Sequence, residues 1–183
     1  MWQFMRGTGK MYGLNVNEWV DERRAFEKST VAAARHLQDL YDSFDDWYLA
    51  LAAYNAGSGR IRSATKRHNT NDFFKIATQR TLKLETRDYV PKYLAQLIIY
   101  KHMLEYGFTP PSELPLLYDS VEVTEPVNLF VMAELLGTTH EEMKRLNPEL
   151  LTPMTPPVKS YSLRVPAGKK ETAVAYIADK NVD

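Results

Sequence analysis

Cysteine is absent from this chain of 183 residues, which excludes disulfides and thiolate metal sites and leaves the cellular compartment open. Long apolar runs are also missing, since none approaches the roughly 18 to 20 residues that cross a bilayer. The N-terminus lacks the basic and then apolar order of a signal peptide. We therefore expect a soluble chain with no membrane span and no export signal of its own.

Net charge is missing too, because 23 Lys and Arg balance 23 Asp and Glu. Residues 1–107 hold 16 basic against 12 acidic residues, and residues 108–183 hold 7 against 11. Neither part is basic enough to predict nucleic-acid binding. The four histidines are scattered without ligand-like spacing, so we expect no metal site. No strand precedes Gly7-Thr8-Gly9-Lys10, so that segment does not indicate a phosphate loop, and we expect no cofactor.

Residues 1–107 carry the apolar spacing of α-helices. One helix of about a dozen residues is predicted from Val31 to Tyr41, after Ser29-Thr30. A short, mostly buried helix is predicted after the N-cap pair Asp45-Asp46, with Gly57 at its end. A longer helix is predicted from about Thr86 to Glu105. The sequence thus predicts a mainly α domain over residues 1–107.

The composition changes at residues 108–117, where three prolines indicate a semi-rigid linker and a domain boundary. Residues 118–168 then read as strand, helix, helix and strand. The predicted elements are 121–123, 129–136, 139–146 and 161–165, with Gly137 between the helices. Residues 169–183 are compatible with a C-terminal helix or a tail.

Three motifs in the helical part resemble those of one enzyme family. They are Trp2-Gln3-Phe4-Met5 with Gly7-Thr8-Gly9, Ala53-Tyr54-Asn55-Ala56-Gly57, and Glu85-Thr86-Arg87-Asp88-Tyr89-Val90. These motifs resemble the lytic murein transglycosylases, most closely the membrane-bound type D branch with its goose-lysozyme-like catalytic domain. The strand-helix-helix-strand segment resembles a LysM peptidoglycan-binding module, although Thr124-Glu125-Pro126 replaces the usual glycine-aspartate turn. The resemblance implies a lysozyme-like helical domain lacking its first helices, followed by a small α+β module.

The resemblance also implies an activity and a location. Members of the family cleave the β-1,4 bond between MurNAc and GlcNAc in peptidoglycan glycan strands, with one glutamate serving as acid and then as base. That glutamate lies upstream of the glutamine motif, in a Glu-Ser pair, and this chain begins after it. We therefore expect a protein of the bacterial cell envelope, and we expect its catalysis to be impaired. The alternative is a non-catalytic protein that binds peptidoglycan or chitooligosaccharides. A second copy could cover the apolar surface that the missing helices would expose.

Five residues are carried over as substrate-binding candidates, and none as a certain catalytic residue. Gln3 would hydrogen-bond sugar substituents, and Tyr54 would support catalysis by orienting the reacting N-acetyl group. Asn55 would support the loop beside Tyr54. Glu85 would hold the substrate or a peptide stem, and Tyr89 would line the site.

Each of these assignments has a structural alternative. Gln3 could be ordered only by packing, and Tyr54 could be a core aromatic residue. Glu85 and Tyr89 could belong to a solvated helix start. Glu85 is also the motif carboxylate that could replace the missing acid, and Phe73 or Phe74 could line sugar subsites.

Overall fold

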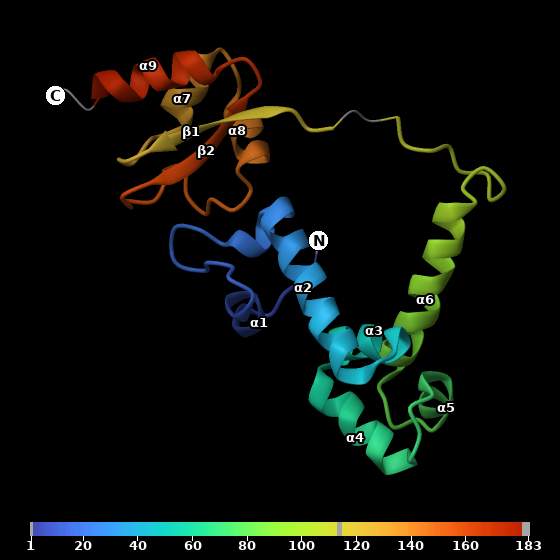
Figure 1. The fold of residues 1–183 in the computed structure, drawn as a ribbon. Helices are drawn as coiled ribbons and strands as arrows, with labels where there is room; N and C mark the ends of the chain where they lie inside the picture. The colour runs from blue at the N-terminus through green and yellow to red at the C-terminus, as the bar shows by residue number, and fades with distance from the viewer. Residues whose placement is uncertain (1, 113–114, 181–183) are drawn as a thin grey trace. The chain divides into compact units, whose positions relative to one another are not determined.

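The computed structural model, drawn in Figure 1, describes residues 2–112 and 115–180. The chain forms two compact units. The first unit joins Met1–Ala32 to Leu114–Asp183, and the second is Ala33–Glu113. The borders predicted at 1–107, 108–117 and 118–168 therefore stay a prediction, because the structure groups the N-terminal segment with the C-terminal one. Parts of the predicted linker and of the predicted tail, residues 113–114 and 181–183, lie outside the described residues.

The second unit is built from helices packed around an apolar core. Its helices are α2 (Phe26–Phe44), which begins in the first unit, α3 (Trp47–Ala56), α4 (Ser58–His68), α5 (Phe73–Thr78) and α6 (Leu84–Lys101). Helix α3 lies at the centre, because its residues 49–53 are all buried and it contacts α4, α5 and α6. Phe73 and Ile76 of α5 and Val90 of α6 join the same core.

The predicted short helix is confirmed as α3, and the reasons for its ends are visible. The carboxylate of Asp46 accepts a hydrogen bond from the Leu49 amide at 2.7 Å, which caps the first turn. Gly57 ends the helix with a φ of 90°, a conformation that glycine adopts without the steric cost of a side chain.

The two other predicted helices exist with different ends. Helix α2 begins at Phe26 rather than after Ser29-Thr30, so both residues lie inside its first turns, where their hydroxyls donate to the Phe26 carbonyl at 3.3 and 2.6 Å. Helix α6 runs from Leu84 to Lys101, and the chain continues in turns up to Gly107.

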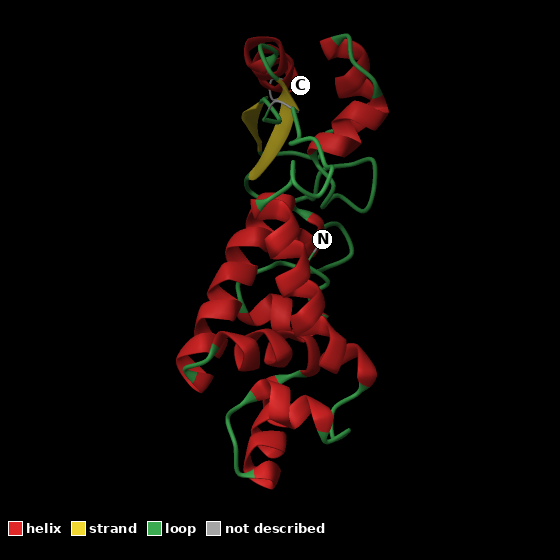
Figure 2. Ribbon diagram, turned by 90° about the vertical axis from the view of Figure 1, so that its right-hand side faces the viewer, coloured by secondary structure: helices red, strands yellow, loops and turns green. Residues whose placement is uncertain are grey.

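The first unit contains a β-α-α-β module with further helices. The elements of this unit are α1 (Arg6–Met11), the 3-10 helix η1 (Glu22–Arg24), β1 (Tyr118–Val123), α7 (Leu129–Leu136), α8 (His140–Leu146), β2 (Tyr161–Pro166) and α9 (Lys170–Lys180). The module itself consists of β1, α7, α8 and β2. Strands β1 and β2 pair antiparallel, with Val121 opposite Leu163 (Figure 2). Gly137 closes α7 in the left-handed conformation. The mainly α fold with a strand-helix-helix-strand module is therefore confirmed.

One face of this sheet builds the core of the first unit. Val121, Val123, Leu163 and Val165 are buried against residues of α7, α8 and α9. Val20, from the N-terminal segment, belongs to the same buried cluster. Among residues 2–112 and 115–180, no helix combines the length and the apolar character that crossing a membrane requires.

Candidate functional site

Four of the five candidate residues lie where the last turn of α3 faces the first turns of α6. The half-buried Tyr54 ring lies 5.3 Å from the His36 ring, measured between centroids. Burial, with a smaller contribution from Tyr89, raises the pKa of Tyr54 to about 12. Burial also raises the pKa of Tyr89 and lowers that of His36. Both phenols therefore keep their protons at neutral pH and can donate hydrogen bonds.

Asn55 connects the two helices through both ends of its side-chain amide. The buried Thr86 hydroxyl donates to Asn55 Oδ1 at 2.8 Å, and Asn55 Nδ2 donates to Glu85 Oε1 at 3.2 Å. Glu85 itself is exposed to solvent. The Asn55 amide thus holds the Glu85 carboxylate at the start of α6, one turn before Tyr89, where it can accept hydrogen bonds from a polyhydroxylated ligand.

The two neighbouring phenylalanines differ in exposure. Phe73 is 1% exposed and belongs to the core, so it cannot line a sugar subsite without rearrangement. Phe74 is 46% exposed and meets the Tyr48 ring edge-on, with 5.4 Å between centroids. Of the pair, Phe74 presents an aromatic surface to solvent.

Gln3 belongs to the first unit, whereas the other four candidate residues belong to the second. It is exposed, has a φ of 52°, and lines a cavity of about 480 Å³ with Arg23, Arg24 and Pro148 among its neighbours. Arg23 Nη1 donates to the carbonyl of Phe4 at 3.0 Å, next to Gln3 in the chain. The segment that carries Gln3 is therefore tied to the turn around Asp21 and Arg23.

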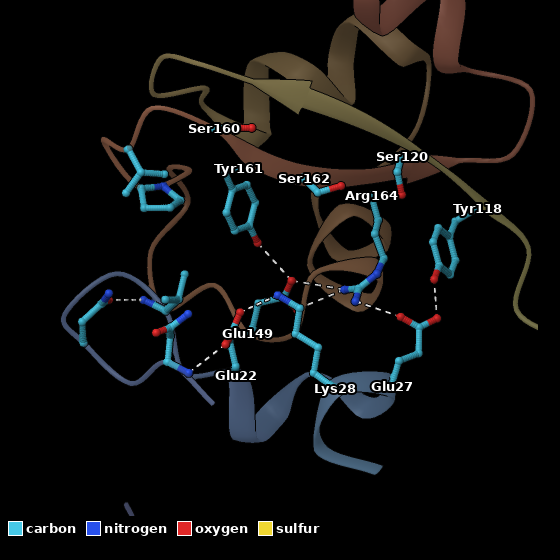
Figure 3. Close-up of a pocket in the computed structure, with 15 residues that line it drawn as sticks. Glu22, Glu27, Lys28, Tyr118, Ser120, Glu149, Ser160, Tyr161, Ser162 and Arg164 are labelled. Atoms are coloured by element: carbon cyan, nitrogen blue, oxygen red, sulfur yellow. Dashed lines mark hydrogen bonds and ion pairs between the residues drawn. The ribbon is translucent and has the colours of Figure 1, made fainter. Parts of the chain in front are cut away.

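A second, larger cavity of the first unit, about 570 Å³, was not indicated by any motif (Figure 3). Charged side chains line it in pairs. Arg164 Nη1 lies 3.2 Å from Glu149 Oε1, and its Nη2 lies 3.0 Å from Glu27 Oε2. The Tyr161 hydroxyl donates to Glu149 at 3.0 Å, and burial raises the pKa of Tyr161. These residues come from distant parts of the chain, so sequence spacing carries no signal of their proximity.

Two residues that contact the candidate residues of α3 and α6 were also missed from the sequence. His36 lies 18 positions before Tyr54, and Thr86 is 31 positions from its partner Asn55. Thr86 falls inside a quoted motif, and its buried hydroxyl is the feature that gives it a role. Among the residues that the structure describes, no three His, Asp or Glu side chains are grouped so that they could hold a metal ion.

Comparisons with known proteins agree with this architecture. Residues 1–77 match the model of the transglycosylase SLT domain, and residues 118–180 match that of the LysM-like domain of lytic transglycosylase MltD. The chain is 35% identical over 153 residues to the membrane-bound lytic murein transglycosylase D of Escherichia coli K12, and equally to that of Escherichia coli O6:H1.

These two alignments cover 80% of this chain, which spans about a third, 33%, of the length of either relative. A protein of Alteromonas sp. (strain M-1), named for tributyltin chloride resistance, is 37% identical over 65 residues, or 35% of this chain and 31% of its own length. Because an SLT domain and the LysM-like domain of this one enzyme type occur here in sequence, the chain belongs to the lytic murein transglycosylases of the membrane-bound type D branch.

Proposed function

We propose that this chain binds the β-1,4-linked MurNAc-GlcNAc strands of peptidoglycan in the bacterial cell envelope and that its own residues support little cleavage. The observation that carries the proposal is the α3–α6 cluster of Tyr54, Asn55, Glu85 and Tyr89, in which the two phenols are half-buried and Asn55 holds the Glu85 carboxylate. Protonated phenols donate to carbonyl groups such as an N-acetyl oxygen, and a carboxylate accepts from sugar hydroxyls. The family of the chain supports peptidoglycan as the ligand.

The environment of Glu85 supports binding rather than proton donation. A general acid for glycoside cleavage needs a pKa raised by burial in an apolar cleft. Glu85 is exposed and accepts a hydrogen bond from Asn55, so it does not lie in such an apolar cleft. In this proposal Glu85 holds a sugar hydroxyl or a peptide stem, and Asn55 positions Glu85. In the first unit, taken by itself, the exposed Gln3 amide can hydrogen-bond sugar substituents.

The test is binding of the full chain to purified peptidoglycan and, by calorimetry, to a chitooligosaccharide. Tyr54→Phe keeps the ring and removes the hydroxyl, so affinity should fall by about 3- to 10-fold, the worth of one hydrogen bond. Tyr48→Phe is the matched control, since Tyr48 lies on the same helix and pairs with Phe74. Equal affinities of Tyr54→Phe and wild type would indicate that the binding site lies elsewhere, for instance in residues 118–180. An absence of any binding would overturn the proposal.

The same preparations decide between binding and cleavage. We expect no anhydro-muropeptides above background by mass spectrometry after incubation with peptidoglycan. Release that disappears in Glu85→Gln would instead identify Glu85 as the acid, because the amide cannot donate a carboxyl proton.

We further propose that a second copy of the chain covers the exposed apolar side of α6. Tyr93 and Tyr100 are 42% and 71% exposed, and their spacing of seven residues places them on the same side of this helix. Exposed aromatic surface of this kind favours association. Light scattering should then show a mass that rises with concentration and falls in Tyr100→Lys, whereas a constant monomer mass would contradict self-association.

A further inference from the structure

The N-terminal segment of the SLT-matched region folds together with the LysM-like module. Val20 is 6% exposed and lies in the module's core. Its backbone forms a bridge with Leu150. On either side of this bridge, the Asp21 amide donates to the Glu149 carbonyl at 2.8 Å, and the Leu151 amide donates to the Trp19 carbonyl at 2.9 Å. The module thus provides both a buried apolar environment for Val20 and backbone hydrogen-bond partners for residues 19–21.

Arg164 adds a charged connection between the same two parts (Figure 3). Its side chain is 8% exposed and pairs with Glu149 of the module at 3.2 Å and with Glu27 of helix α2 at 3.0 Å. The guanidinium also lies 5.4 Å from the ring centroids of Phe26 and Tyr118, one from each part. Tyr118 completes the contact by donating to Glu27. One buried cation therefore joins strand β2 to the start of α2.

A chain of contacts leads from this connection to Gln3. The amide of Asp21 is held by the module, and the carboxylate of Asp21 pairs with Arg23 at 2.6 Å. Arg23 in turn donates to the carbonyl of Phe4 at 3.0 Å. Gln3, the residue before Phe4, has a φ of 52°, which a non-glycine residue keeps only where its surroundings fix it. Pro148 of the module lines the same cavity as Gln3.

We propose that the LysM-like module is a clamp for the N-terminal motif, formed by the Val20–Leu150 bridge and the Arg164–Glu27 ion pair, with Arg164 as a positioning residue for Gln3. The module then has a second role beside any glycan affinity of its own. It fixes the backbone of residues 2–25, so that the Gln3 amide is presented in one orientation. The effect on glycan affinity rests on the proposed function, whereas the clamp itself does not.

Hydrogen exchange of the full chain, followed by mass spectrometry, tests the clamp directly. Arg164→Ala should raise the hydrogen-exchange rate of residues 15–25 by about tenfold or more, because the buried carboxylate of Glu149 loses its charged partner. Glu27→Gln removes the more exposed end of the pair and leaves the module core intact, so it should raise exchange of the same residues about 2- to 5-fold. Glu142→Gln, which removes a surface pair with Arg145 in the module, is the matched control and should leave them unchanged.

The two variants separate the clamp from general unfolding. If Arg164→Ala also raises exchange throughout α7 and α8, the module itself has opened, and Glu27→Gln decides alone. Unchanged exchange of residues 15–25 in Glu27→Gln, with α7 and α8 protected, would overturn the clamp. Arg164→Lys keeps the charge and should recover part of the protection, whereas Arg164→Met, which keeps a similar side-chain length without the charge, should not.

A second measurement asks whether the clamp acts through Gln3. Glu27→Gln should weaken chitooligosaccharide binding about 2- to 5-fold in the wild-type background and have no further effect on Gln3→Ala, since two changes on one path are not additive. Additive losses would overturn the positioning role of Arg164 and Glu27. Wild-type protein that fails to bind any glycan would overturn the proposed function instead, and the exchange result would still decide the clamp.

Discussion

Replacing Phe73 with alanine is expected to lower the free energy of unfolding of the second unit by about 3 to 5 kcal/mol, the usual cost of truncating a buried phenylalanine. The ring is 1% exposed and packs in the core with Leu49, Ile61 and Ile76. Its removal leaves a cavity, because neighbouring helices relax only partially into the space. A unit of this size is marginally stable, so such a loss is a large part of its total stability.

The neighbouring residue provides the control. Phe74→Ala removes the same side chain from a position that is 46% exposed, so we expect a loss of about 1 kcal/mol or less. Urea denaturation followed by circular dichroism measures both losses. Similar losses for the two variants would contradict the core position of Phe73. Reduced glycan binding by Phe74→Ala with unchanged stability would assign the exposed ring to a sugar subsite.

The sequence alone could not distinguish these two rings. Helix α5 has six residues, less than two turns, so its apolar spacing is too short to define a buried face. The distinction comes from tertiary packing, because α5 contacts α3 and α4 and Phe73 joins their common core. The Asp72 carboxylate caps the helix start by accepting hydrogen bonds from the amides of Phe74 and Lys75 at 3.0 and 3.2 Å, but this local contact does not decide which ring is buried.

Longer elements were more predictable because several local signals agreed. Helix α3 had a capping aspartate, an apolar run and a terminal glycine, and it formed with the predicted ends. The module showed alternating strands and a glycine between two helices, and its order is confirmed. The pairing of segments far apart in the chain could not be predicted, since Glu27 and Arg164 are 137 positions apart and belong to no common motif.

The candidate site divides in the same way. The motifs placed Tyr54, Asn55, Glu85 and Tyr89, and the structure brings these four together at the junction of α3 and α6. The motifs could not predict which of their side chains hydrogen-bond to one another. Thr86, for example, stands out because its buried hydroxyl is satisfied by Asn55, which depends on the packing of two helices rather than on local sequence.

The second large effect is expected for Glu149→Ala in the first unit, a loss of about 3 to 5 kcal/mol from the free energy of unfolding. The side chains of Glu149 and Arg164 are 6% and 8% exposed, and their closest atoms are 3.2 Å apart. Truncating the carboxylate leaves a buried guanidinium whose remaining charged partner is Glu27, and it also deprives the Tyr161 hydroxyl of its acceptor. The expected loss of stability therefore comes from the buried guanidinium and hydroxyl that lose a partner. It exceeds the net free energy that the ion pair contributes to folding.

A second Glu–Arg pair in the same module makes the comparison sharp. Glu142 and Arg145 lie 2.7 Å apart, a shorter distance, yet their side chains are 31% and 57% exposed. Glu142→Ala should therefore cost about 1 kcal/mol or less, because water replaces the lost partner. Glu149→Gln, which keeps an acceptor for Tyr161, should fall between the two. If calorimetric unfolding gave a loss for Glu142→Ala as large as that for Glu149→Ala, burial would not govern the cost of losing these pairs, and the prediction would be wrong.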